Sequence, residues 1–169
     1  MKASKLFLVL LFTSIFTCST GTWYYTVYAE YLYYMAKHTQ YLSQEKSVKF
    51  KIGIYGSRNM YDATRQMSLT KRVEQKLIYV EELSTLPTDS DYQLIFIGKD
   101  KVADLPKAIA YCKKYNLLLV SDIAGSVSKG GDVEFLEDQA GNIKFKINAT
   151  ACSSRGIKVS PVLQNMAMK

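Results

Sequence analysis

Few residues in this 169-residue sequence could carry metal or nucleophilic chemistry. It contains one histidine, His38, and three widely spaced cysteines, Cys18, Cys112 and Cys152. A structural zinc site needs four nitrogen or sulfur ligands, and a catalytic site needs three plus a water. A serine hydrolase needs a histidine base beside its nucleophile, and His38 lies in a predicted N-terminal helix, far along the chain from the candidate serines. We therefore predict no catalytic residues, no metal site and no cofactor, and we expect that the protein is not an enzyme.

Polar residues follow three apolar segments that we predict to be strands. They are Arg58, Lys99, and the pair Ser121 and Asp122. In open α/β sheets, ligands bind beyond the carboxyl ends of the strands. Arg58 and Lys99 could hold an anionic group there, although neither G-x-G-x-x-G nor G-K-[S/T] accompanies them. A small-ligand pocket and ordinary loop chemistry are therefore two alternatives for these residues.

Tyrosine is concentrated near the N-terminus, where residues 24–34 hold six of the thirteen. Apolar and aromatic side chains recur there with helical spacing and predict one amphipathic helix over residues 24–41. Tyrosine has an apolar ring and a polar tip, which suits a helix that packs on a sheet and meets a partner with its other face. We predict Tyr31, Tyr34 and Tyr41 as the partner-facing residues.

The first 21 residues have the order of a secretory signal peptide. Two lysines precede an apolar run over residues 6–16, and small residues follow. We predict cleavage between residues 17 and 22. One alternative is an uncleaved anchor, because the chain carries no charge from residue 6 to 29, enough to cross about 30 Å of hydrocarbon. Lipidation of Cys18 is another.

Each of these alternatives exports the remainder of the chain. Residues 22–169 then form one domain in the periplasm, because a single domain has about 100 to 200 residues. The formal net charge of the whole chain is +7. A nucleic-acid-binding domain would gather that charge on one face, whereas here lysines and acids are interleaved, as in residues 99–107. We therefore expect no nucleic-acid partner.

Cys112 and Cys152 have two alternative states in an exported protein. An oxidising compartment permits a disulfide between them. However, Cys112 follows Leu105 and Ile109 at helical spacing, which places it on the apolar stripe of a helix and favours buried free thiols. The sequence does not decide between a disulfide and free thiols.

Apolar segments alternate with helical ones along the middle of the chain. With 48% hydrophobic residues, a chain of this length can bury a sizeable core. The predicted strands cover residues 49–55, 77–80, 92–97 and 117–120, and the predicted helices cover 59–76 and 104–115. Strands of this kind, separated by helices, form a parallel sheet.

The C-terminal part of the sequence departs from this alternation. Residues 132–137 and 143–148 flank a five-residue loop that contains glycine, which predicts a β-hairpin. A short helix is predicted over residues 149–155. The predicted fold class is therefore α/β, with a mainly parallel sheet flanked by helices and a C-terminal antiparallel β-hairpin.

Several short motifs in the C-terminal half occur in a characteristic order. They are Ser121-Asp122, Gly130-Gly131, Phe145 with Ile147-Asn148, Arg155-Gly156 with Ile157, and Leu163. The N-terminal helix follows a looser pattern through Ala29, Tyr31, Leu32, Tyr33, Met35, Lys37 and Tyr41. In these features, residues 26–167 resemble the YfiR/HmsC family of small periplasmic proteins.

The resemblance implies a single YfiR-like domain that acts as a regulator. Members of that family are periplasmic repressors that bind the sensory domain of an inner-membrane diguanylate cyclase. They lower cyclic-di-GMP and biofilm formation until an outer-membrane lipoprotein or a redox signal relieves them. The implied partners are thus a membrane cyclase or sensor kinase, and an outer-membrane lipoprotein.

The resemblance adds Asn148 and Arg155 to the candidate ligand- or partner-binding residues. A homodimer is possible, and the sequence does not decide the oligomeric state. The alternative function is a periplasmic small-ligand-binding protein whose pocket lies at the carboxyl ends of the strands.

Overall fold

The computed structural model describes residues 20–41 and 48–168. Residues 1–19, which contain most of the predicted signal sequence and Cys18, lie outside the described residues. Among the helices in the described ranges, none is both long and apolar enough to span a bilayer.

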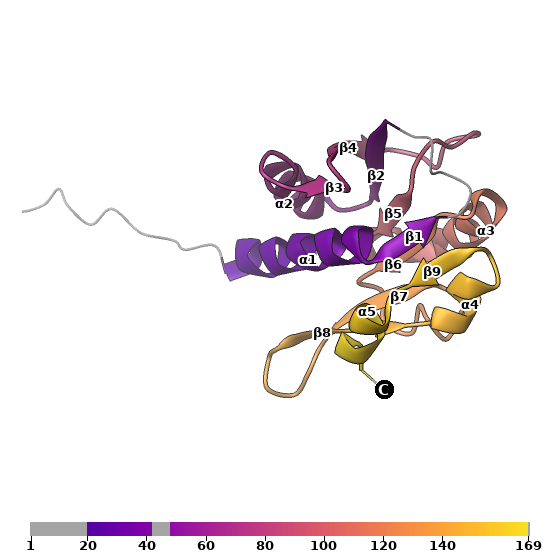
Figure 1. Cartoon of the computed structure of the whole chain (residues 1–169). Coiled ribbons are helices and arrows are strands. Elements are labelled where there is room, and N and C mark those ends of the chain that lie inside the picture. The colour runs from indigo at the N-terminus through magenta and orange to yellow at the C-terminus, as the bar shows by residue number, and fades with distance from the viewer. Residues whose placement is uncertain (1–19, 42–47, 169) are drawn as a thin grey trace, which may run out of the picture.

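Seven strands form the central sheet (Figure 1). Their order across the sheet is β3 (Arg72–Val73), β4 (Lys76–Leu83), β2 (Lys49–Tyr55), β5 (Leu94–Ile97), β6 (Leu118–Ser121), β7 (Val133–Glu137) and β8 (Ile143–Ile147). The five strands from β4 to β7 are parallel to their neighbours, whereas β3 and β8 are antiparallel edge strands. The fold is therefore α/β, as predicted, and its sheet is mixed.

Helices cover both faces of the sheet. On one face, α1 (Thr20–Lys37) and α2 (Arg58–Ser68) bury Leu32 and Met60 against strand residues such as Ile52 and Phe96. On the other face, a 3₁₀ helix, η1 (Lys99–Asp104), leads into α3 (Leu105–Tyr115), which packs on β5 and β6. All four side chains of β5, which alternate between the two faces of the sheet, are fully buried between these layers.

Local sequence explains where α2 and α3 begin and end. The hydroxyl of Ser57 accepts a hydrogen bond from the Met60 amide and caps α2. Pro106 occupies the first turn of α3, where its missing N–H costs no hydrogen bond. Asn116 adopts the left-handed conformation that ends α3.

The last elements of the chain return to the beginning of the domain. After the hairpin come α4 (Ala149–Ser153), β9 (Ile157–Val159) and α5 (Pro161–Met166). β9 pairs with β1 (Thr39–Tyr41) in a separate antiparallel sheet, with Thr39 opposite Val159. The segment after α1 is thereby joined to the C-terminal part of the chain.

The structure corrects several predicted element boundaries. The strand predicted over residues 92–97 begins at Leu94, and the strand predicted over residues 117–120 covers Leu118–Ser121. The first helix ends at Lys37, because Thr39 and Tyr41 alternate with exposed Gln40 as a strand against β9. The second helix ends at Ser68 and is followed by the β3–β4 hairpin, whose turn has positive φ at residues 74 and 75. The strand predicted over residues 77–80 extends to 83, and the helix predicted to end at 155 ends at Ser153.

Candidate functional site

The carboxyl ends of β2 and β5 approach each other closely. The Gly98 amide donates to the Tyr55 carbonyl at 2.8 Å, and a Cβ on Gly98 would lie 2.3 Å from the Gly56 oxygen. The side chain of Lys101 covers Gly56, and its Nζ lies 5.1 Å from the centre of the Tyr55 ring. Backbone and side chains therefore pack closely where these two strands end.

The residues predicted to bind a ligand at this edge are engaged with other protein groups. Lys99 and Asp122 come together, since the Lys99 amide donates to the Asp122 carboxylate at 2.7 Å. Ser121 is buried and its hydroxyl bonds that of Ser126 at 2.7 Å. Arg58 is exposed and pairs with Glu82 at 2.7 Å, and also with Asp62. A pocket formed by Arg58, Lys99, Ser121 and Asp122 stays a prediction.

Helix α1 reaches the same end of the sheet through Tyr28. Its ring stacks on Phe135 of β7, with 4.6 Å between centroids. Burial, followed by the charge of Asp122, raises the pKa of Tyr28 to about 12. Burial also raises the pKa of Asp122, although the hydrogen bond from the Lys99 amide lowers it in part. The phenol of Tyr28 is therefore neutral at physiological pH, and its ring packs as an apolar group.

Arg155 lies in the interior, where it pairs with Asp132. Their side chains are 11% and 2% exposed. Arg155 also donates to the carbonyls of Cys112 and Leu117, at 3.3 and 3.2 Å. The second carboxylate oxygen of Asp132 accepts from the Leu119 amide at 2.8 Å. This buried pair connects the residues around α4 to the end of α3 and the starts of β6 and β7.

Asn148 has a local role beside this pair. Its side-chain oxygen accepts from the Ala151 amide at 3.0 Å and caps α4. Cys112 and Cys152 are both buried and free, which is the alternative without a disulfide. Burial raises the pKa of Cys152 to about 12 and that of Cys112 well above its usual range, so both are thiols rather than reactive thiolates.

The three tyrosines predicted to face a partner have different positions. Tyr31 packs on the hairpin, with its ring 5.5 Å from that of Phe145 and its hydroxyl donating to the Ile143 carbonyl at 3.2 Å. Tyr41 lies in β1 rather than in the helix and is 9% exposed. Tyr34 is 41% exposed and stacks on His38. Among the three, Tyr34 has the most surface for a partner to contact.

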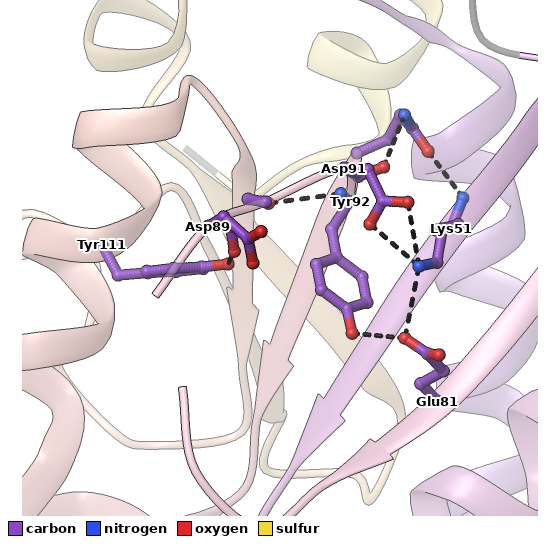
Figure 2. Close-up of polar contacts among 8 residues, drawn as sticks. Lys51, Glu81, Asp89, Asp91, Tyr92 and Tyr111 are labelled. Carbon is purple, nitrogen blue, oxygen red and sulfur yellow. Dashed lines mark hydrogen bonds and ion pairs between the residues drawn. The ribbon is translucent and has the colours of Figure 1, made fainter. Parts of the chain in front are cut away.

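A polar cluster that the sequence reasoning missed lies at the other end of β2. We call Lys51, Glu81, Asp91 and Tyr92 the Lys51 cluster (Figure 2). The Lys51 ammonium lies 2.8 Å from the Asp91 carboxylate and 3.5 Å from that of Glu81. The Tyr92 hydroxyl donates to Glu81, and the Lys51 ammonium lies 4.8 Å from the centre of the Tyr92 ring. Lys51 of β2 thus contacts both β4 and the segment that precedes β5.

The Lys51 cluster fixes the connection over residues 84–93, which carries the chain from β4 to β5 without a helix. The same connection is held to α3, because the Tyr111 hydroxyl donates to the Asp89 carbonyl at 2.9 Å (Figure 2). Burial and the hydrogen bond to Glu81 raise the pKa of Tyr92. Burial lowers the pKa of Lys51, but Asp91 and Glu81 raise it more. Lys51 is therefore charged and Tyr92 neutral at physiological pH.

The sequence carried one weak signal for this cluster. Lys51 stands inside the apolar strand segment KFKIGIY, where a charged side chain needs a partner. Nothing local indicated Glu81 or Asp91 as that partner. Within residues 20–41 and 48–168, no three histidine, cysteine, aspartate or glutamate side chains are grouped so that they could hold a metal ion.

Comparison with known proteins agrees with the resemblance seen in the sequence. A family model described as YfiR/HmsC-like matches residues 25–168. A search of curated proteins finds no match to the chain. The chain belongs to the YfiR/HmsC-like family, whose members are regulators rather than enzymes and act with periplasmic protein partners.

Proposed function

We propose that this member of the YfiR/HmsC-like family is a periplasmic signalling adaptor. It binds the periplasmic sensory domain of an inner-membrane diguanylate cyclase or sensor kinase, represses it, and so controls cyclic-di-GMP or related signalling. The observation that carries the proposal is the family match, which extends over residues 25–168 and so covers the whole described domain apart from its first helical turns. The family suggests both the periplasm and cyclic-di-GMP regulation.

The roles of the polar residues support binding rather than catalysis. Groups at the strand ends bond one another: the Asp122 carboxylate accepts from the backbone amide of Lys99, and the Ser121 hydroxyl bonds that of Ser126. Arg155 and Asp132 form a buried pair that joins elements of the fold. The histidine, His38, stacks on Tyr34 just after α1, on a different element from these groups. The side chains of Asp122, Ser121, Arg155 and His38 therefore each make contacts within the protein that require no substrate.

Exposed aromatic side chains on α1 give the adaptor one surface for a partner. Trp23 is 58% exposed and Tyr34 is 41% exposed. Tryptophan and tyrosine are enriched where proteins bind one another, because they bury a large area at little conformational cost. Export of residues 22–169 would place this helix on the same side of the membrane as a cyclase sensory domain.

The test is a deletion of the gene in its native cell, followed by measurement of cyclic-di-GMP and biofilm. We expect both to rise, and the full chain supplied in trans to restore them. Affinity purification of the full chain from solubilised membranes should then recover a cyclase or sensor kinase, and its isolated periplasmic domain should bind the chain directly. Unchanged cyclic-di-GMP together with no direct binding would contradict the proposal.

An outer-membrane lipoprotein that relieves the repression is a further part of the proposal. It would compete with the membrane cyclase for the adaptor. In a reconstituted mixture, we expect addition of the lipoprotein to release the sensory domain. The binding experiment therefore also tests this second partner.

A further inference from the structure

Strand β4 has a long open edge. On one side β2 pairs with β4 over residues 77–83. On the other side β3 pairs only with Lys76 and Leu77, because β3 has two residues. In the part of the chain that the structure describes, residues 78–83 therefore have no second neighbouring strand. Their outward backbone N–H and C=O groups can accept another strand.

This edge carries two charged residues, Glu81 and Glu82, but lacks the other features that usually prevent strand addition. Proteins protect open edges with lysine, proline or bulges. Residues 78–83 read IYVEEL, with neither lysine nor proline, and three of the six, Ile78, Tyr79 and Val80, are residues that favour strands. In the same strand, Leu77 and Tyr79 are 46% and 39% exposed on the face that α3 covers farther along the sheet. An added strand would find apolar surface as well as backbone groups.

The edge is also held rigidly. Glu81 is fixed by Tyr92 and Lys51, as Figure 2 shows, and Glu82 is fixed by Arg58 at 2.7 Å. Lys49 lies over the Tyr79 ring at 4.3 Å. A strand that is already ordered loses little freedom when it binds, so more of the interaction energy becomes affinity.

We propose that the open edge of β4 binds an extended segment of the partner protein by strand addition. The segment has apolar residues that alternate with basic ones, so that its basic residues lie on the face of Glu81 and its apolar residues lie on the face of Val80. Charge complementarity supports this choice, because the Glu81 carboxylate is half-exposed and lies 3.5 Å from its cation, Lys51, on a protein whose net charge is +7. Backbone hydrogen bonds between β4 and the added strand supply affinity, and the alternating side chains of the added strand supply specificity. The inference rests on the proposed function in taking the sensory domain as that partner.

A second copy of the chain fits this edge less well. In a symmetric antiparallel pair, a two-fold axis passes between identical residues of the two strands. An axis at Glu81 places the two Glu81 side chains directly opposite each other, and an axis at Val80 places them diagonally. Like charges at these positions destabilise a strand pair. A strand with basic residues at the same positions has the opposite effect.

The test uses the full chain and two synthetic peptides about seven residues long, in which valine alternates with lysine or with glutamate. Peptide binding is measured by fluorescence anisotropy, and amide hydrogen exchange is followed along the chain. Tyr79→Lys is the blocking variant. Val162→Lys is the matched control, because Val162 is 55% exposed on α5, near β8 at the other end of the sheet (Figure 1).

We expect the lysine peptide to slow exchange within residues 78–83 by at least about tenfold. Tyr79→Lys should weaken its binding by a similar factor, and Val162→Lys should not. The inference is overturned if the peptide protects another segment or none, or if both peptides bind equally. Protection that appears in the chain alone as its concentration rises would identify a second copy as the occupant and would also overturn it. If Tyr79→Lys does not fold, the exchange data on the unsubstituted chain decide.

The cell assay separates this inference from the proposed function. If the deletion raises cyclic-di-GMP and folded Tyr79→Lys restores it as well as the unsubstituted chain does, the adaptor function stands and the edge is not its binding site. If the deletion changes nothing, the adaptor function fails, and the exchange experiment still decides whether residues 78–83 accept a strand.

Discussion

Removal of the Arg155 charge is expected to destabilise the protein strongly. In Arg155→Met, the Asp132 carboxylate, 2% exposed, loses its counter-charge. Removing one partner of a buried ion pair costs about 3–5 kcal/mol. The Cys112 and Leu117 carbonyls lose a donor as well. The whole free energy of unfolding of a domain is about 5–15 kcal/mol, so the variant would lose a large share of it.

The assay is urea and thermal unfolding of the purified chain. A loss of about 3–5 kcal/mol corresponds to a fall in Tm of about 6–20 °C, at about 2–4 °C per kcal/mol for a domain of this size. The stability of Arg155→Lys should lie between that of the parent and that of Arg155→Met. Lysine keeps the charge but lacks the planar guanidinium that reaches several acceptors. Arg58→Met is the matched control: Arg58 also pairs with carboxylates but is exposed, and we expect no measurable change.

The pH dependence of the same variant distinguishes a charge effect from a packing effect. Burial raises the pKa of Asp132, and Arg155 opposes that rise. Without Arg155 the pKa of Asp132 rises further, so the folded variant keeps a proton that the unfolded chain has released. Its stability therefore falls as pH increases from about 4 through the raised pKa. The difference in the free energy of unfolding between Arg155→Met and the parent should be smaller at about pH 5 than at about pH 8. A loss below about 1 kcal/mol, equal at both pH values, would refute the reasoning.

Four further outcomes are expected. Gly98→Ala should cost about 1–3 kcal/mol in urea unfolding, since its Cβ would lie 2.3 Å from the Gly56 oxygen; an unchanged midpoint would show that the strand ends can separate. Tyr41→Phe should leave stability unchanged or raise it by up to about 1 kcal/mol, because its buried hydroxyl has no hydrogen-bond partner among the described residues; a clear loss would reveal a partner. Thiol titration, with Cys18 not counted, should find two thiols in urea and none reactive in the folded chain; no thiols in urea would establish the disulfide. Phosphate should not shift Tm, because Arg58 is already paired; a shift that Arg58→Ala abolishes would support the small-ligand function instead.

Local sequence patterns predicted those parts of the fold that depend on near neighbours. The strand at residues 49–55 was correctly bounded because its apolar run ends at a glycine. The hairpin was identified because buried Ile143 and Phe145 alternate with exposed lysines, as pairing on one buried face requires. These signals lie within a few residues of the element that they specify.

The parts that were missed depend on pairing between distant segments. β1 has three residues and exists because β9, more than a hundred residues later, pairs with it. The turn at residues 74 and 75 contains glutamate and glutamine at positive φ, which sequence patterns assign to glycine or asparagine. No local pattern could have separated β1 from the preceding helix or shown β3.

The candidate site illustrates the same limit for side chains. Arg155 was identified from a resemblance, but its role depends on Asp132, which precedes β7. Lys51 likewise depends on Glu81 and Asp91, which different elements supply. A charged residue inside an apolar segment signals that a partner exists, whereas the identity of that partner follows only from the topology.

Several tyrosines stabilise the fold by linking segments that are distant in the sequence, and this affects where a partner-binding surface should be sought. Tyr31 bonds the hairpin, Tyr55 bonds Asp104 at 2.7 Å, and Tyr111 bonds the connection over residues 84–93. Each ring covers apolar surface while its hydroxyl reaches a polar group on another segment, which is the arrangement that favours buried tyrosine. Tyr31, which we predict to face a partner, therefore also has a role within the fold, because it bonds the hairpin. The surfaces that we propose for direct recognition are therefore the exposed rings of α1 and the backbone groups along the open edge of β4.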